Sequence, residues 1–397
     1  MQEKILSGIK VIEMSTYVAG PCCAKILGEW GADVIKIESS KGDGWRYNGE
    51  TTDDNNPIFA TDNYGKKFIS INMKSEEGAK IVYRLLENAD IFITNFRTDA
   101  LKRLNLTYEE LQERYPELIY AQVQGYGDKG PLKDKPGFDS TAFFARSGIL
   151  LDIAEAGEIP CNSPATVGDH TLTLAILSGI LAALYNRTKT GKGDLVTSGL
   201  YQSAIYLLSS MLVESQLGIK YPMSRKRAID PISNTYKCKD GLWIMVAGTN
   251  YLAYLPKFAQ LTDLPELMEN EKYNSPVGGI LYSEEITAMI EKRMLTKTRD
   301  EWMRIFEEGD FPCEVVQHIP DVLEDDQAWA NDYLREVKLA NGDTRIFANT
   351  PVTIQSQGTP EFKHPPKIGG DTREVLKEMG YTDDVIDKWM SKGVIFG

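Results

Sequence analysis

Short apolar runs alternate with amphipathic stretches over the first third of the chain. An apolar run bounded by turn residues is typical of a buried strand, and an amphipathic stretch between two such runs is typical of a helix. Helices are predicted to begin near Pro21, Ser75 and Thr107, because each of these residues favours a helix N-terminus. Five runs predict strands: residues 8–14, 33–38, 67–73, 89–95 and 118–124. This alternation predicts a mostly parallel α/β sheet with helices on both faces and ligands at the carboxyl ends of its strands.

The pattern becomes helical between residues 138 and 213, where long apolar stretches predict several helices, one of them over 170–186. An Arg- and Lys-rich linker follows at 221–230, and the pattern of hydrophobic and charged residues changes after it. Residues 234–246 predict a hairpin, and helices with charged faces succeed it, so we interpret 221–325 as a smaller α+β domain.

The tail beyond this domain predicts two strands around an Asn341-Gly342 turn and a final helix from Asp371 to Met379.

Composition and charge exclude several classes of protein. The chain has 397 residues, of which 42% are hydrophobic and 25% charged, so it is not disordered. Its net charge of -13 excludes nucleic-acid or anionic-membrane binding by bulk charge. An anionic ligand would therefore need a local basic patch.

No signal for secretion, membrane insertion or metal binding stands out. The first eight residues have no apolar core of the kind a secretory signal has, and the longest uncharged stretch, Thr171 to Asn186, is shorter than the ~20 apolar residues of a membrane span. Five cysteines, an odd number without C-x-x-C spacing, argue against a disulfide framework and a zinc site. We expect a cytoplasmic protein without a metal.

Two motifs have both a functional and a structural interpretation. Residues 125–130 match the G-x-G-x-x-G spacing of dinucleotide-binding loops, but turn residues rather than a helix follow Gly130, which favours a connecting loop. Cys22 and Cys23 at a helix N-terminus are either reactive thiols or small buried residues, and the second interpretation is favoured because free cysteine usually packs as a small hydrophobe. The common hydrolase and P-loop motifs are absent from the sequence.

Basic residues follow the carboxyl ends of the predicted strands. They form either a mouth for phosphate groups or a set of solvated surface charges, and spacing alone does not separate these alternatives. The residues are Lys36, Lys74, Arg97, Lys102, Arg103, Lys129, Lys133 and Lys135.

Asp169 occupies the most informative single position, where a polar loop enters the apolar helix. Aspartate is a preferred N-cap, so a capping role is the first interpretation. The alternative is catalytic: a carboxylate near the positive end of a helix dipole is expected to stay ionised at neutral pH, and it can then attack an acyl carbon.

The motifs taken together resemble the class III, formyl-CoA-transferase-like CoA-transferases along nearly the whole chain. Within that family the chain is most similar to the clostridial 2-hydroxyacyl transferases, which act on phenyllactate or 2-hydroxyisocaproate. This closer likeness lies in residues 136–148 and 326–334. The family motifs are Ala19-Gly20-Pro21, residues 31–38, Gly42-Asp43 with Arg46, Asn72 to Lys74, Asn95 to Arg97, Gly125 to Gly127, Gly130-Pro131, Gly137 to Asp139, Gly168-Asp169 and Thr190 to Asp194.

The resemblance implies a fold and an assembly. A Rossmann-like large domain would comprise residues 1–220 and 326–397, and the small domain residues 221–325. Two ring-like chains would interlock as a homodimer.

The resemblance also implies a chemistry without metal or prosthetic group, in which acyl-CoA and a small carboxylic acid are the substrates. Asp169 would attack the acyl-CoA to give an anhydride and then carry CoA as a thioester to the acceptor acid. The CoA groove would be lined by Val18, Ala19, Ile71, Asn72, Met73, Lys74, Asn95, Phe96, Arg97 and Arg103.

The sequence departs from the family pattern at two places. Ser39 stands where the family prototype has a CoA-binding arginine, so Lys36, Arg46 or Arg97 is expected to contact phosphate instead. The stretch 225–233 lacks the glycines of the family's active-site lid.

Three other functions remain as alternatives. A racemase of the same superfamily would need a histidine in place of Phe138 to move the α-proton, and a phenyl ring cannot do so. A nicotinamide oxidoreductase is disfavoured by the glycine spacing without its helix. A non-catalytic CoA-binding or assembly protein is opposed only by Asp169 and its setting.

Overall fold

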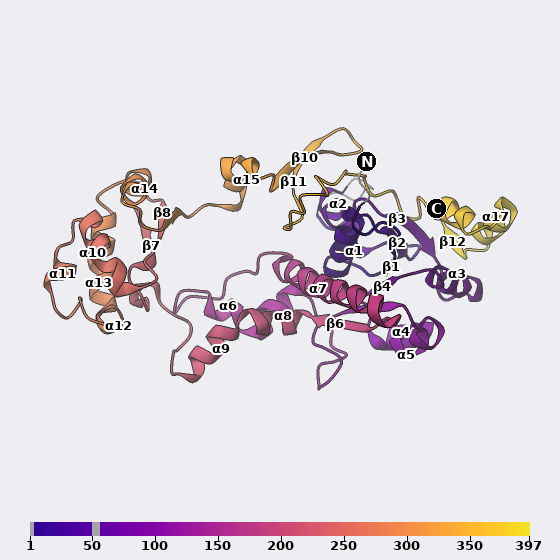
Figure 1. Ribbon diagram of the computed structural model, residues 1–397, viewed down its shortest axis with the longest axis horizontal. Helices are drawn as coiled ribbons and strands as arrows, with labels where there is room; N and C mark the ends of the chain where they lie inside the picture. The colour runs from indigo at the N-terminus through magenta and orange to yellow at the C-terminus, as the bar shows by residue number, and fades with distance from the viewer. Residues whose placement is uncertain (1–3, 50–55) are drawn as a thin grey trace. The chain divides into compact units, whose positions relative to one another are not determined.

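The computed structural model describes residues 4–49 and 56–397 and divides into two compact units (Figure 1). The large unit comprises residues 1–147, 163–210 and 326–397, and the small unit residues 148–162 and 211–325. The small unit thus includes 148–162 and 211–220, which the sequence analysis assigned to the large domain. Residues 1–3, part of the N-terminal stretch examined for a secretory signal, lie outside the described residues.

A seven-stranded sheet forms the centre of the large unit, in the order β12-β3-β2-β1-β4-β5-β6. Neighbouring strands are parallel except β12, which runs antiparallel to β3. The mostly parallel sheet predicted from the sequence is therefore confirmed. Its strands are β1 (Lys10–Met14), β2 (Asp33–Glu38), β3 (Lys67–Ile71), β4 (Ile91–Thr94), β5 (Ile119–Gln124), β6 (Leu195–Gly199) and β12 (Ile395–Phe396).

Both faces of the sheet are covered because successive strand residues point to opposite sides. On one face, Ile12, Phe92 and Tyr120 pack in a cluster with α3 (Glu76–Leu86), α4 (Thr98–Leu104) and α5 (Tyr108–Arg114). On the other face, α1 (Ala19–Glu29) and α7 (Val167–Thr190) contact each other and strands β1, β5 and β6. The sheet core thus fixes the strand ends that carry the site.

The predicted caps are confirmed at α3 and α5. The Ser75 side chain accepts the N–H of Gly78, and Thr107 and Glu110 form a reciprocal capping box. The start of α1 differs from the prediction, because Ala19 and Gly20 already belong to the helix and Pro21 is its third residue. A proline in the first turn lacks only an N–H that has no partner within the helix.

α7 is longer than the predicted helix over 170–186, and by length and composition alone it could cross a membrane. It packs instead against α1, β5, β6, α8 (Leu200–Leu207) and the π-helical segment η2 (Asp139–Ala145). These contacts bury one side of the helix, including Leu172, Ile176 and Ile180, whereas Leu174 is 41% exposed.

The C-terminal part of the large unit begins with α15 (Asp326–Ala330) and a hairpin of β10 (Leu334–Lys338) and β11 (Thr344–Ala348). The hairpin confirms the predicted turn at Asn341-Gly342, and α16 (Thr372–Glu378) confirms a helix within 371–379, but it is not the final helix of the chain as predicted. α17 (Asp383–Ser391) and β12 follow and were not predicted. The remaining short elements of the large unit are η1 (Gly44–Tyr47) and α2 (Pro57–Asn63).

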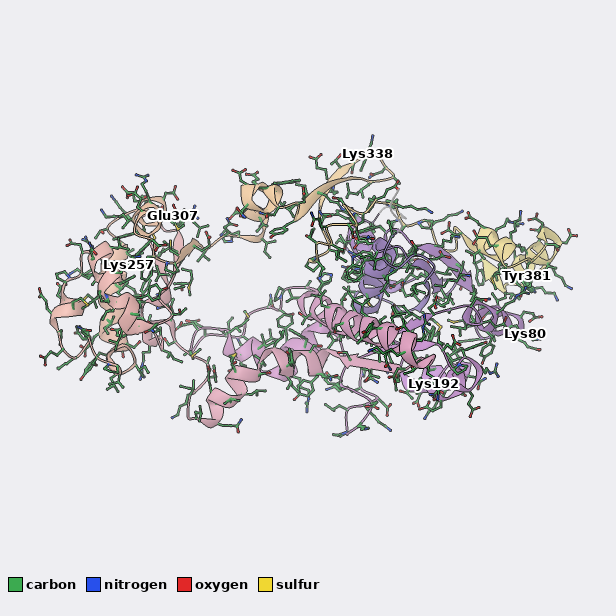
Figure 2. All side chains as sticks on the ribbon, in the orientation of Figure 1. Lys80, Lys192, Lys257, Glu307, Lys338 and Tyr381 are labelled. Carbon is green, nitrogen blue, oxygen red and sulfur yellow. The ribbon has the colours of Figure 1, made fainter. Side chains whose placement is uncertain are left out.

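The small unit has an antiparallel sheet of β7 (Ser233–Lys237), β8 (Trp243–Ala247) and β9 (Cys313–Val315), so the predicted hairpin is confirmed. Three longer helices pack on it: α10 (Tyr251–Thr262), α13 (Ser283–Met294) and α14 (Arg299–Glu308). Lys257 and Glu307 mark the charged faces of α10 and α14 (Figure 2). Its short elements are α6 (Ile149–Asp152), α9 (Ser209–Gln216), η3 (Arg225–Arg227), α11 (Glu266–Glu269), α12 (Gly278–Leu281) and η4 (Ile319–Glu324).

The glycine-free stretch 225–233 is anchored within the small unit. The Arg225 N–H donates to Glu155 at 2.7 Å, and the carbonyl of Pro231 accepts the Tyr236 hydroxyl at 2.5 Å. Ile232 is fully buried. Each of these contacts would have to break before the stretch could move.

Candidate active site

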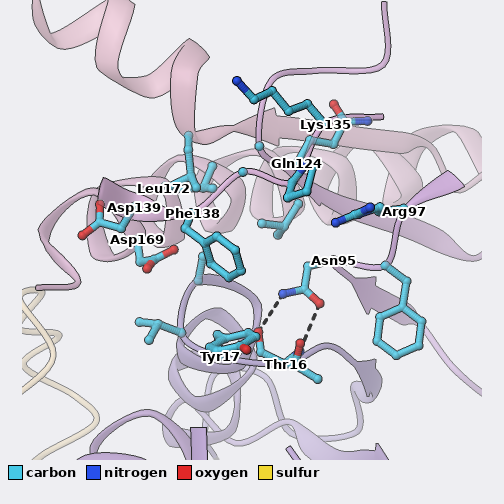
Figure 3. Close-up of a pocket in the computed structure, with 18 of the residues that line it drawn as sticks. Thr16, Tyr17, Asn95, Arg97, Gln124, Lys135, Phe138, Asp139, Asp169 and Leu172 are labelled. Carbon is cyan, nitrogen blue, oxygen red and sulfur yellow. Dashed lines mark hydrogen bonds between the residues drawn. The ribbon is translucent and has the colours of Figure 1, made fainter. Parts of the chain in front are cut away.

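A cavity of about 900 Å³ opens at the carboxyl ends of the parallel strands (Figure 3). Its wall comes from the residues after β1, β4 and β5, from the loop 133–140 and from the first turn of α7. The place agrees with the general rule that open α/β sheets bind ligands at this edge. Asp169 lines the cavity together with Asp139, Tyr17 and Phe138.

Asp169 is the third residue of α7 and not its N-cap, so the capping interpretation is wrong. The cap position belongs to Thr166, which has a left-handed backbone with φ of 68° and makes no side-chain cap bond. A β-branched residue in this conformation is strained, and such strain is concentrated at functional sites. The backbone here directs the first turn, with Asp169, toward the cavity.

The expectation that Asp169 is fully ionised at neutral pH is also corrected. Burial, together with the negative charges of Asp139 and Asp62, raises the pKa of Asp169 to about 7, although the positive charge of His170 acts in the opposite direction. Burial and like charges thus outweigh the helix dipole. Near neutral pH the carboxylate and carboxylic acid forms of Asp169 coexist.

Asp139 shares this end of α7. Burial raises the pKa of Asp139, while the backbone N–H groups of Gly168 and Thr166 lower it. Two partly buried carboxyl groups at one site oppose each other's ionisation. The sequence placed Asp139 within a family motif but gave no sign that it lies beside Asp169.

Three aromatic residues, Tyr17, Trp45 and Phe138, form one wall of the cavity. Tyr17 packs edge-on against Phe138 with ring centroids 5.6 Å apart and lies 6.3 Å from the ring of Trp45. Tyr17 has a left-handed backbone (φ 66°), and its N–H donates to the buried Asp43 at 3.0 Å. The sequence analysis missed Tyr17 and Trp45, because no motif marks them, and it considered Phe138 only as the residue that stands in place of a racemase's histidine.

Six of the ten residues expected along the CoA groove line the cavity: Val18, Ala19, Asn95, Phe96, Arg97 and Arg103. The Asn95 amide exchanges two hydrogen bonds with the backbone of Thr16, at 3.0 and 2.7 Å, and so ties the end of β4 to the end of β1 (Figure 3). The other four residues do not line it: Ile71, Asn72, Met73 and Lys74.

The basic residues fall into distinct groups. Arg97, Arg103, Lys133 and Lys135 line the cavity, which supports the phosphate-mouth interpretation for these four. Lys74, Lys102 and Lys129 do not line it.

Lys36 and Arg46 are unavailable for phosphate, contrary to the expectation that they replace the arginine absent at Ser39. Lys36 is fully buried and pairs with Glu13 at 2.6 Å and Asp43 at 3.0 Å. Arg46 is buried and pairs with Glu38 at 2.8 Å. Both cations already have buried partners, so their role is structural. Of the three candidates, Arg97 alone lines the cavity.

The structural interpretation is confirmed for the glycine-rich loop and for Cys23. No helix follows Gly130, and a Cβ on Gly125 would come within 2.8 Å of the Gly137 Cα, so these glycines allow two backbone segments to touch. Cys23 is fully buried, and burial raises its thiol pKa, which makes it a poor nucleophile.

One group of metal-binding side-chain types, Cys22, Asp62 and His170, lies close together among the described residues. His170 and Asp62 are hydrogen-bonded to each other, and we assign no metal to them.

Comparison with known proteins adds the family. The model of CoA-transferase family III matches residues 6–372. The chain belongs to this family. It is 44% identical to the (R)-2-hydroxy-4-methylpentanoate CoA-transferase of Clostridioides difficile, over 98% of this chain and 99% of that one. It is 40% identical to the cinnamoyl-CoA:phenyllactate CoA-transferase of Clostridium sporogenes, over 97% and 95%.

Solved structures agree with this family III assignment. A variant of Rv3272 from Mycobacterium tuberculosis superposes with a TM-score of 0.83 at 25% identity, over 94% of this chain and 99% of that one. A CAIB/BAIF family protein from Brucella suis gives 0.80 at 25% identity, over 95% and 100%. The protein is therefore a CoA-transferase with the family's α/β fold, and its substrates are a CoA thioester and a carboxylic acid.

Proposed function

We propose that this family III CoA-transferase moves CoA from an acyl-CoA to an (R)-2-hydroxy acid with a branched or aromatic side chain, and that Asp169 carries the transfer. The observation that supports this most directly is the position of Asp169 in a cavity with an aromatic wall and a basic rim. Two relatives of 44% and 40% identity are named for 2-hydroxy acids of these kinds.

The proposed chemistry begins with the ionised Asp169. Its carboxylate attacks the thioester carbonyl, the C–S bond breaks, and an aspartyl anhydride and CoA thiolate form. The thiolate then attacks the aspartyl carbonyl and releases the donor acid, which leaves an aspartyl-CoA thioester. The acceptor carboxylate displaces CoA to form a new anhydride, and the thiolate attacks the acceptor's acyl carbon. Acyl-CoA of the new acid leaves, and the Asp169 carboxylate is restored.

Different residues of the cavity wall bind CoA and the acid in this proposal. Arg97, Arg103, Lys133 and Lys135 place positive charge for the phosphates of CoA, where Arg acts as a bidentate donor and Lys as a point charge. Tyr17, Trp45 and Phe138 offer apolar surface for the side chain of the acid. Phe138 stands where a racemase would need a proton-transferring histidine, so α-proton exchange lacks one of its two groups.

Hydroxylamine trapping tests the nucleophile. Enzyme incubated with acyl-CoA and hydroxylamine should acquire a hydroxamate at Asp169, located by peptide mass spectrometry. Asp139 in the same samples is the internal control, and it should remain unmodified. Turnover with Asp169 unmodified would overturn the proposal, as would deuterium exchange at the α-carbon without an acceptor acid.

We further propose that the enzyme is an interlocked homodimer in the cytoplasm. Its five cysteines are free, as in a reducing compartment. Tyr206 in the large unit is 79% exposed, and Leu217 in the small unit is also 79% exposed, which suits surfaces that a second copy covers. Light scattering after size-exclusion chromatography should give about twice the monomer mass of 44.5 kDa, and a monomeric mass would contradict it.

A further inference from the structure

Asp62 contacts two parts of the active site, the Trp45 side chain of the cavity wall and the His170 side chain next to Asp169. It lies on α2, is only 2% exposed, and accepts hydrogen bonds with both of its oxygens. Its Oδ2 accepts the indole N–H of Trp45 at 3.2 Å, and its Oδ1 lies 3.2 Å from Nε2 of His170. Trp45 lines the cavity, and His170 is the residue after Asp169. One buried carboxylate thus supports the aromatic wall and the turn that bears the nucleophile.

The interaction between Asp62 and His170 is favourable when His170 carries a positive charge. A buried ionised carboxylate is costly without a cationic partner, and His170 is the cationic residue paired with Asp62 in the described part of the chain. Burial lowers the pKa of His170, but hydrogen bonds to Asp62 and Cys22 outweigh this effect and raise it to about 10. The ring is therefore an imidazolium at neutral pH, and Nε2–H donates to Asp62.

The charge on His170 opposes the other influences on Asp169. Burial, Asp139 and Asp62 all favour the protonated acid, whereas His170 favours the carboxylate. The titratable groups that face this turn come from three elements: Cys22 on α1, Asp62 on α2 and Asp139 on η2. Among these groups, His170 alone supplies positive charge.

We propose that His170 is a positioning residue for the nucleophile: held by Asp62, its imidazolium favours the carboxylate form of the neighbouring Asp169, while the same Asp62 fixes Trp45 in the cavity wall. The inference rests on the proposed function, because it takes Asp169 as the nucleophile. His170 itself is half exposed and does not line the cavity, so it acts through Asp169 and not on the substrate.

The test is the pH dependence of kcat/KM in His170→Gln. The acid limb should move up by about one pH unit, so that activity at pH 6.5 falls about tenfold while activity at pH 9 stays within about threefold of the parent. Asp62→Asn should shift the acid limb less, because the substitution has two opposing effects. Loss of the Asp62 carboxylate lowers the pKa of Asp169 directly, whereas the accompanying loss of positive charge on His170 raises it. His318→Gln, an exposed histidine of the small unit, is the matched control and should leave the profile unchanged.

Two outcomes would overturn the inference. Superposable pH profiles would show that His170 does not influence Asp169, and an equal loss at every pH would mark a purely structural role. Hydroxylamine labelling of the parent enzyme separates the two proposals: labelled Asp169 with an unshifted His170→Gln profile rejects this inference alone, whereas unlabelled Asp169 rejects the proposed function. If His170→Gln does not fold, the Asp62→Asn profile decides. An acid limb that moves to higher pH upholds the inference, because loss of the charge on His170 then outweighs loss of the Asp62 carboxylate, and a limb that stays in place or moves to lower pH rejects it.

Discussion

The side chain of Asp139 lies so close to Gly168 that a Cβ at position 168 would come within 2.2 Å of its Oδ1. The same Cβ would meet Phe143 at 2.3 Å. Position 168 must therefore be glycine for η2 and the first turn of α7 to approach each other as they do. The distance relates the Gly-Phe-Asp and Gly-Asp motifs directly, although 30 residues of sequence separate Asp139 from Asp169.

Gly168→Ala should lower kcat about 100-fold, because the clash displaces Asp139 or the turn that carries Asp169 and small misplacements at a reacting centre have effects of this size. Steady-state kinetics measure the loss. Gly28→Ala in α1 is the control, since a Cβ there meets only the Val34 side chain of β2, at 3.3 Å. Equal activities of the two variants would contradict the argument.

The parent enzyme should lose activity as the pH falls through about 7, because the pKa of Asp169 lies near that value and the proposed mechanism needs its carboxylate form. A profile of kcat/KM against pH measures the acid limb. Asp139→Asn removes a negative charge that raises the pKa of Asp169, so its limb should move to lower pH. A flat parent profile between pH 5 and 8, or an Asp139→Asn limb that moves upward, would disprove this account.

Arg97→Gln should raise the KM for acyl-CoA about tenfold and leave the KM for the acceptor acid nearly unchanged, as expected for the loss of a charge-assisted contact to phosphate. Lys74→Gln is the matched control, because Lys74 is exposed and does not line the cavity. If Lys74→Gln has the larger effect, CoA binds along residues 71–74 as the family resemblance implied.

Phe138→Ala should lower kcat/KM for phenyllactate by about 10- to 100-fold, since apolar contact with the acid's side chain is lost. Glycolate, a 2-hydroxy acid without a side chain, should be affected little by the same substitution. Tyr47→Ala removes an exposed ring outside the cavity and should leave kcat/KM unchanged for both acids. Equal losses for the two acids would place the side-chain pocket elsewhere.

Glu13→Gln should destabilise the protein by about 3–5 kcal/mol, because Lys36 and Lys66 would remain buried without their shared carboxylate. Urea unfolding followed by circular dichroism measures the change. Glu76→Gln removes an exposed pair with Lys80 and should leave the midpoint where it is. Similar midpoints for both variants would refute the structural role of the buried cluster.

The sheet was predictable because its strands are short apolar runs between strong turn residues. β6 was missed because Leu195–Gly199 is partly exposed and ends in polar and glycine residues, and β12 because it has only two residues. The start of α7 was predicted too late in the chain, because Val167 and Gly168 resemble loop residues in the sequence. Only the left-handed backbone of Thr166 shows that the helix begins at Val167.

The motif in the sequence was enough to single out Asp169 as the candidate nucleophile, whereas the surroundings of its side chain could not be predicted. Lys36 and Arg46 looked like phosphate ligands because their partners, Glu13 and Glu38, are recognisable only after the strands are aligned. Asp62 lies 108 residues from His170, and no local pattern relates them. The ionisation of Asp169 depends on such contacts between distant parts of the chain.

β12 pairs Ile395 and Phe396 with Ile71 and Ser70 of β3, and Asp371 accepts the N–H of Phe68. During synthesis, more than 300 further residues must therefore be made before the main-chain N–H and C=O groups on the outer edge of β3 find their hydrogen-bond partners in β12. A nascent chain must protect that open edge against other strands until residues 395–396 have left the ribosome.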